Sequence, residues 1–162
     1  MVERTSRLVV VRVGWGEPTD DGDFFFNFHV KMGLVSSWRE MADYKSLNAL
    51  NTAFKASSES YKNIAFPQFS NKEALYILES LRDVSYDKET VKAVERHRAQ
   101  MEIWINSVIS NIFEVNTETR RMCRILLFNS AENASRFSGW MRANGIFEGD
   151  SGLDSISEES EA

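Results

Sequence analysis

Two stretches near the beginning of the chain decide the fold: LVVVRVGW at residues 8–15 and FFFNFHVKM at residues 24–32. The first is rich in β-branched residues, which favour strands, and it is followed by the turn-forming GEP at residues 16–18. The second alternates, with apolar side chains at every even position from 24 to 32. The segment TDDGD at residues 19–23 has turn chemistry, so the two stretches predict an antiparallel hairpin.

The remaining chain predicts one further strand and then helices alone. A weaker strand is expected over Val35–Met41, after a turn at Gly33. Helical spacing of apolar residues predicts helices over 44–57, 70–81, 87–113, 119–128 and 131–143. The longest of them has a stripe that we expect to be buried: Val91, Val94, Met101, Trp104, Ile105, Val108, Ile109 and Ile112. Strands first and helices afterwards predict an α+β fold, in which a three-stranded antiparallel sheet packs against a helical subdomain.

Charge divides the chain into a body and a tail. We expect a folded domain over residues 5–130, an additional C-terminal helix over 131–146 and an acidic, disordered tail over 147–162. The tail holds six acidic side chains and no base, which leaves 18 of the 24 acidic side chains against all 19 Lys and Arg in the body. A near-neutral body does not favour nucleic acid as a partner, because nucleic-acid binding needs many Lys and Arg on phosphates.

The sequence offers little catalytic chemistry. The two histidines are His29 and His97, and we find no metal-ligand spacing and no glycine-rich phosphate loop. Glu95 and Glu102 are interpreted as solvated residues of a helix face. We therefore expect neither an enzyme nor a metal or other cofactor. The single cysteine, Cys123, and the lack of any stretch of ~20 apolar residues favour a cytoplasmic protein.

Three local motifs, in their order along the chain, resemble the phox-homology (PX) domain of the sorting-nexin kind. REMADY at residues 39–44, followed by leucines, is similar to the RRYSDF with which the family's third strand ends. FPQFSNK at residues 66–72 is similar to its proline-containing connector, and RHRAQMEIWI at residues 96–105 to its later helix with an arginine pair. The resemblance covers about residues 7–128 and implies the same α+β fold and a non-enzymatic, phosphoinositide-binding module.

In that family a pocket of cations binds the phosphorylated inositol ring of a phosphoinositide, because forked donors on phosphate oxygens and an aromatic floor suit such a ring. The resemblance implies that Lys72 contacts a phosphate near the membrane. It also implies that His97, flanked by Arg96 and Arg98, takes the place of the arginine that bonds the ring hydroxyls. Ion pairing of the two arginines with neighbouring glutamates on a solvated face is the alternative.

The chain departs from the family at the most informative position of this pocket. The arginine that holds the 3-phosphate and the aromatic residue under the sugar correspond to Glu40 and Met41, and a carboxylate repels a phosphate. Arg39 is adjacent, but neighbouring strand residues face opposite sides, so it replaces the missing arginine only if a bulge re-aims it; otherwise it is a solvated residue. We expect Glu40 to face the same cleft as Lys72 and one of Arg96, His97 or Arg98, and to pair with one of these cations.

Two functions remain open on the sequence alone. In the first, the chain associates peripherally with phosphoinositide-containing endosomal or vesicular membranes, with Leu75 and Tyr76 in contact with the bilayer; the alternative for these two residues is core packing. In the second, 3-phosphate binding is lost and the PX fold serves as an interaction module for a trafficking protein. Lys72 and the apolar connector favour the first function, since the connector either packs on the body or meets an apolar partner. Glu40 favours the second.

Overall fold

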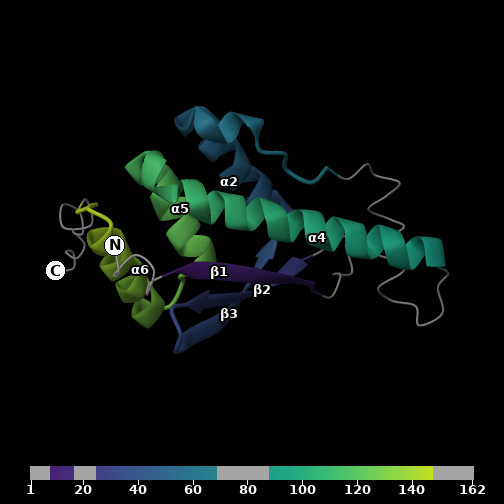
Figure 1. Ribbon diagram of the computed structural model, residues 1–162, viewed down its shortest axis with the longest axis horizontal. Helices are drawn as coiled ribbons and strands as arrows, with labels where there is room; N and C mark the ends of the chain where they lie inside the picture. The colour runs from purple at the N-terminus through teal and green to yellow at the C-terminus, as the bar shows by residue number, and fades with distance from the viewer. Residues whose placement is uncertain (1–7, 17–24, 69–87, 148–162) are drawn as a thin grey trace.

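The computed structural model describes residues 8–16, 25–68 and 88–147, and these form an α+β fold (Figure 1). Three antiparallel strands are arranged in the order β1-β2-β3: β1 (Val9–Trp15), β2 (Phe25–Met32) and β3 (Ser36–Asp43). The helices that follow are α2 (Tyr44–Ser57), α4 (Lys88–Asn111), α5 (Thr117–Leu127) and α6 (Ala131–Ala143), with short 3-10 turns η1 (Ser60–Asn63) and η2 (Ile112–Glu114). The predicted class, a three-stranded antiparallel sheet packed against helices, is confirmed.

Most predicted boundaries agree with the structure to within two residues. The helices over 44–57 and 131–143 are found with those bounds. β3 ends at Asp43 instead of Met41, because its pairing with β2 continues to Asp43 opposite Phe25. α5 begins two residues earlier than predicted, after Asn116, whose side chain accepts a hydrogen bond from the backbone N–H of Thr119 at 2.8 Å. The predicted helix over 70–81 and the tail from residue 148 on lie outside the described residues.

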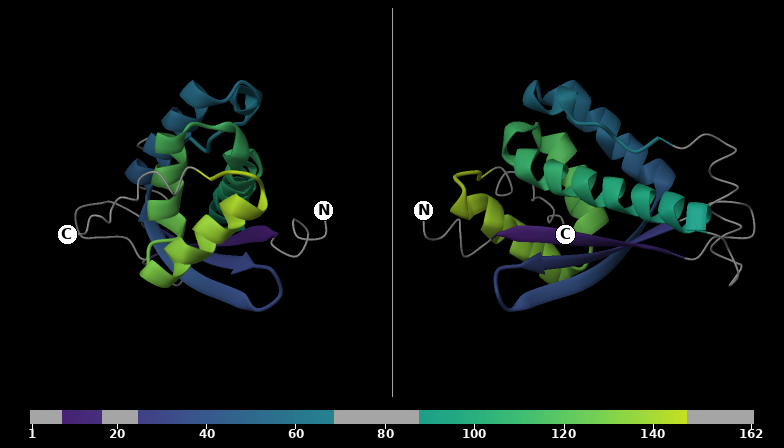
Figure 2. Two further views of the ribbon diagram at one scale, coloured as in Figure 1. Left: turned by 90° about the vertical axis from the view of Figure 1, so that its left-hand side faces the viewer. Right: turned by 45° about the vertical axis from the view of Figure 1, so that its right-hand side comes forward.

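The sheet has one buried face and one exposed face. Alternate residues of β2 are buried, as predicted, and so are Val9, Val11 and Val13 of β1. All the helices lie on this side of the sheet in the views of Figures 1 and 2. The opposite side chains, which include Arg12 and Lys31, are exposed. The described helices therefore leave the outer face of the sheet uncovered.

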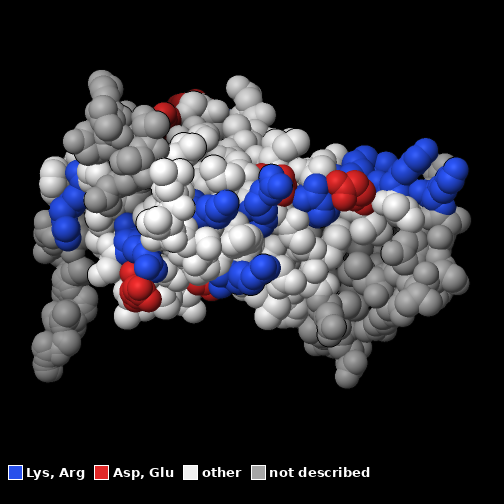
Figure 3. Space-filling model, turned by 60° about the horizontal axis from the view of Figure 1, so that its bottom comes forward, with Lys and Arg blue, Asp and Glu red and all other residues white. Residues whose placement is uncertain are grey.

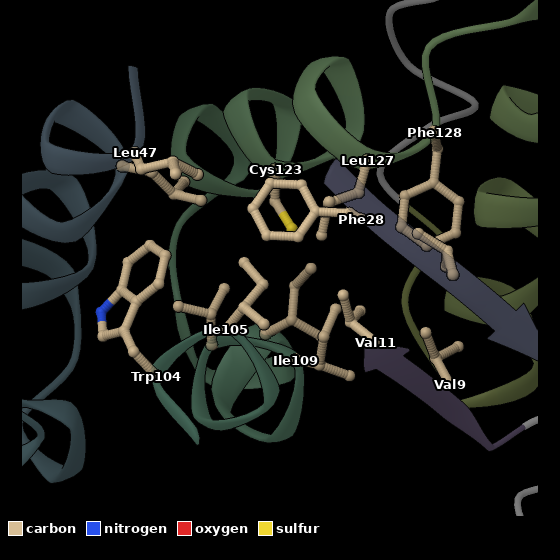
Figure 4. Packing of buried hydrophobic residues seen from close by; sticks show 14 of the residues in the cluster. Val9, Val11, Phe28, Leu47, Trp104, Ile105, Ile109, Cys123, Leu127 and Phe128 are labelled. Atoms are coloured by element: carbon tan, nitrogen blue, oxygen red, sulfur yellow. The ribbon is translucent and has the colours of Figure 1, made fainter. Parts of the chain in front are cut away.

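The core forms where α4 and α5 meet the inner face of the sheet. Figure 4 shows Leu47 of α2, Ile105 of α4, Cys123 of α5 and Phe28 of β2 pointing toward one another. Each fully buried aliphatic or aromatic side chain of this kind contributes about 1.5–3 kcal/mol relative to exposure. Two residues of the predicted buried stripe are exceptions. Val94 is half-buried, and Val91 is exposed, because the first turns of α4 extend beyond the end of the sheet (Figure 1).

The free edge of β1 is covered by side chains of α4. Asn106 accepts from the N–H of Val11 at 2.9 Å and donates to its carbonyl at 2.8 Å, as a neighbouring strand does. Two residues farther along β1, Glu102 accepts from the N–H of Val13 at 2.9 Å, and Arg98 donates to the Val13 carbonyl at 2.9 Å. Four helical residues rise about 6 Å and two strand residues about 6.8 Å, so a helix face can follow a strand edge over this length. The interpretation of Glu102 as a solvated residue is therefore wrong.

The apolar connector packs on the body over its described part. Phe66 and Pro67 are buried. The Tyr44 hydroxyl donates to the Pro67 carbonyl at 2.6 Å, and the ring of Phe66 lies 5.3 Å from that of Tyr44 and 4.8 Å, edge-on, from that of Trp104. Of the two alternatives for the connector, packing on the body holds for Phe66 and Pro67.

The contacts of Asn106 with β1 predict a specific loss of stability. Asn106→Ala leaves the N–H and the carbonyl of Val11 without their side-chain partner, so we expect the free energy of unfolding to fall by about 1–3 kcal/mol. Urea unfolding measures it. Ser107→Ala on the same helix, whose hydroxyl bonds only the Ile103 carbonyl of its own turn, is the control and should change stability by less than about 0.5 kcal/mol. Equal effects of the two substitutions would contradict this account of the β1 edge.

The burial of Cys123 predicts an unreactive thiol. Complete burial raises the pKa of the Cys123 thiol to about 12, so almost no thiolate is present near neutral pH. We expect iodoacetamide to alkylate the folded protein at least about 100-fold more slowly than the urea-unfolded protein at the same pH. Mass spectrometry of timed samples gives both rates. Similar rates in the two states would mean that the thiol is not buried in solution.

Candidate functional site

The described pocket residues lie on two elements, β3 and α4. Arg39, Glu40 and Met41 are on β3, which is the edge of the sheet away from β1, whereas residues 96–98 are on α4, which covers the β1 edge. Lys72, Leu75 and Tyr76 lie outside the described residues, so the roles implied for them stay predictions.

Glu40 contacts the backbone before α6 instead of a cation. It is half-buried on the same side of β3 as Trp38, and its Oε2 accepts from the N–H of Asn129 at 3.3 Å. Asn129 directly precedes Ser130, the residue that caps α6. Among the described residues Glu40 has no ion pair, so a pairing with residues 96–98 is wrong, whereas Lys72 lies outside the described residues. The carboxylate helps to fix the connection between α5 and α6.

Arg98 is held within the protein by four hydrogen bonds. Its Nε and Nη2 form a fork on Glu95, at 2.9 and 2.7 Å, and its Nη1 donates to Glu102 at 3.0 Å as well as to the Val13 carbonyl. The bonds to Glu95 and Glu102 raise the pKa of the Arg98 guanidinium, and Arg98 in turn lowers the pKa of Glu95. Its side chain is only 27% exposed. The alternative of ion pairing with neighbouring glutamates therefore holds for Arg98, which also anchors α4 to β1.

His97 is buried and Arg96 is exposed. The imidazole of His97 is 4% exposed, with Nδ1 2.7 Å from the carbonyl oxygen of Ala93. This geometry does not present the ring to a ligand in solvent, in contrast to the role that the resemblance implies. The sequence held a signal for this burial: His97 lies four and seven residues before Met101 and Trp104, on the same apolar stripe. Arg96 lies off that stripe and is exposed.

Arg39 and Met41 lie on the outer face of the sheet. The pairing of β2 with β3 runs without interruption from Phe25↔Asp43 to Met32↔Ser36, so no bulge turns Arg39 toward the side of Glu40. Arg39 is opposite His29 on β2, which in turn is opposite Arg12 on β1. The three side chains form a row across the sheet, and exposed Lys31 is in the neighbouring row.

Sequence reasoning missed this row as a unit. The alternation of the second strand placed His29 and Lys31 on its polar face, but the register that aligns His29 with Arg12 and Arg39 arises only on pairing. Figure 3 shows this side of the molecule, with Lys and Arg spread over it and fewer acidic side chains. The outer face therefore carries three exposed cations, Arg12, Lys31 and Arg39.

Within residues 8–16, 25–68 and 88–147, no group of three or more His, Cys, Asp or Glu is placed to hold a metal ion. The helices of the same ranges are all too short or too polar to cross a membrane. Comparison with models of known protein families gives no match to this chain, and comparison with curated proteins gives none either. The functional proposal therefore depends on the residues described above.

The two neighbouring arginines of α4 predict opposite results on substitution. Arg98→Ala removes the donor to the Val13 carbonyl and the partner of two glutamates, so we expect the free energy of unfolding to fall by about 1–3 kcal/mol. Arg96→Ala, at an exposed site, should change it by less than about 0.5 kcal/mol. Thermal and urea unfolding compare the two variants. A stable Arg98→Ala protein would show that this guanidinium is not a structural anchor.

Proposed function

We propose that the chain is a non-enzymatic interaction module of PX type, working in endosomal or vesicular trafficking, in which 3-phosphate binding is lost. The observation that carries the proposal is the contact of Glu40 with the N–H of Asn129. At this position the PX family has the arginine that holds the phosphate, and charge-assisted hydrogen bonds of that kind contribute about 1.5–3 kcal/mol each. A carboxylate there replaces this attraction with repulsion.

The α4 side of the implied pocket supports the same conclusion. Arg98 forms its hydrogen bonds with Glu95, Glu102 and the Val13 carbonyl, and His97 is buried. Releasing Arg98 for a ligand would expose the edge of β1. A headgroup would therefore have to compete with contacts that stabilise the fold, which disfavours a high-affinity inositol site.

A second candidate, phosphoinositide-dependent membrane association at endosomes, is favoured by one observation. Arg39 and Arg96 are exposed and have no hydrogen bond or ion pair among the described residues, so both are available to an anionic ligand. With Lys72 they would supply three of the cations that the resemblance implies. The two candidates differ in whether the 3-phosphate itself raises the affinity.

Vesicle co-sedimentation at matched surface charge separates the two candidates. We expect vesicles that contain phosphatidylinositol 3-phosphate to bind no better than vesicles in which phosphatidylserine supplies the same charge. Glu40→Arg should not create a preference, because Arg98 remains bonded to its glutamates and to β1, and Glu40→Gln, which keeps an acceptor oxygen, is the matched control for the Asn129 contact. A preference for the 3-phosphate in the unmodified protein, abolished by Lys72→Ala, would overturn the proposal in favour of the second candidate.

A further inference from the structure

The turn between β2 and β3 exposes large apolar side chains. Leu34 is 100% exposed and Val35 is 95% exposed. Gly33, at φ 67°, makes the turn and donates its N–H to the Leu8 carbonyl at 2.9 Å, which brings the beginning of β1 beside it. Leu8 is itself 62% exposed. These three residues, Leu8, Leu34 and Val35, are called the apolar tip below.

The fold does not account for the apolar tip. Turn positions usually carry Gly, Asn, Asp, Ser or Pro, and neither Leu34 nor Val35 packs against the body. A single exposed leucine is ordinary on a protein surface. Here Val10, on the outer face of β1 opposite Lys31, is exposed beside the tip as well. Large apolar side chains gathered at one end of a sheet indicate a surface that meets an apolar phase or a partner.

Cations follow directly behind the tip on the outer face. Lys31 lies three residues before Leu34. The row Arg12–His29–Arg39 crosses all three strands two residues farther from the tip than Lys31. We call Arg12, Lys31 and Arg39 the cationic row; His29 lies between Arg12 and Arg39. The ion pairs of the described residues join side chains of α4, α5, α6 and η1, and none includes Arg12, Lys31 or Arg39. The acidic residue of the outer face among the described residues, Asp43, is at the opposite end of the sheet from the tip.

The spacing of tip and row matches the depth of a membrane interface. Arg12 is four residues from Leu8 and Arg39 is four residues from Val35, which is about 14 Å along a strand. Apolar groups of peripheral proteins enter the bilayer by about 5–10 Å. With the tip at that depth, the cationic row lies at or just outside the lipid headgroups, where anionic phosphates attract Lys and Arg.

We propose that the apolar tip and the cationic row form a membrane-contact surface for anionic bilayers, with the tip inserted and the row on the headgroups. The proposal does not depend on the PX-like function, because it uses the β2–β3 turn and the outer face of the sheet instead of the implied inositol pocket. One weak apolar insertion combined with a cationic patch is the combination that holds a protein reversibly on a membrane. Apolar residues form the tip, and cations follow behind it. This order favours a bilayer over a protein partner, because an anionic bilayer has an apolar interior covered by anionic headgroups.

Co-sedimentation of the full chain with phosphatidylcholine vesicles, with and without phosphatidylserine, tests the proposal. We expect binding only when phosphatidylserine is present, with an affinity that falls as salt is raised. The double substitution Leu34→Ser and Val35→Ser should weaken binding about tenfold or more. Ile103→Ser and Ile125→Ser, which replace exposed apolar residues of α4 and α5, are the matched control and should leave binding within about twofold.

The contribution of charge to vesicle binding is tested with a second pair of double substitutions. Arg12→Gln with Arg39→Gln should weaken binding to phosphatidylserine vesicles about 25-fold, since each basic residue near the membrane changes the affinity about fivefold. Lys45→Gln with Lys55→Gln removes the same net charge from exposed positions on α2, which lies on the other side of the sheet (Figure 1), and should have little effect. Unchanged thermal unfolding of all variants ensures that binding, not folding, is compared.

Insertion of the tip is measured with a fluorophore. Because Cys123 is buried, Leu34→Cys supplies a single reactive thiol for an environment-sensitive probe. We expect a blue shift and an intensity increase on phosphatidylserine vesicles, and none for Ile103→Cys.

Absence of vesicle binding, binding that is unaffected by both double substitutions, or a probe at residue 34 that stays in water would overturn this proposal while leaving the loss of 3-phosphate binding intact. Vesicle binding that requires the 3-phosphate headgroup and Lys72 would instead overturn the proposed function. Capture of a purified trafficking protein through the tip, without vesicle binding, would identify the surface as a protein interface and overturn the membrane proposal.

Discussion

An edge strand cannot leave its N–H and carbonyl groups both buried and unpaired, and in this protein α4 satisfies those of β1 with side chains. Asn106, Glu102 and Arg98 bond Val11 and Val13 as a fourth strand would. This ladder fixes the position of α4 along the sheet, and it thereby sets which residues of the helix face the inner side. Trp104, Ile105 and Ile109 are buried as a consequence, and the core assembles around them.

The same contacts decide what remains available for binding. Arg98 is used to hold α4 on β1, and Glu40 is used to hold the chain before α6. Two positions that a phosphoinositide site would need for its ligand thus contribute to stability instead. Because the described helices all lie on the inner side, the outer side chains of the sheet stay in solvent. Arg12 and Arg39 on this face, and Leu34 and Val35 at its end, are exposed.

The resemblance to the PX domain and the departure from it involve different classes of residue. Tyr44 of the first motif bonds Pro67 and stacks on Phe66 of the second, and Phe66 packs on Trp104 of the third. The motifs therefore coincide at residues that pack against one another. The position that differs, Glu40, is one at which the family's residue binds a ligand. Core packing constrains the shape of side chains, whereas the charge at a ligand position is constrained only by the ligand.

The sequence by itself determined the element types, most of their bounds and the buried face of the sheet, because strand alternation and helical spacing are local properties of the chain. It also located Trp104 and Met101 in the core. Only the tertiary structure decided that Glu40 bonds Asn129 and that Arg98 reaches the Val13 carbonyl, because the fold brings these distant atoms together. The pairing of Arg98 with Glu95 and Glu102 is local, and the sequence had offered it as an alternative. The alignment of Arg12, His29 and Arg39 likewise depends on the register between strands, which sets long-range neighbours that no local pattern encodes.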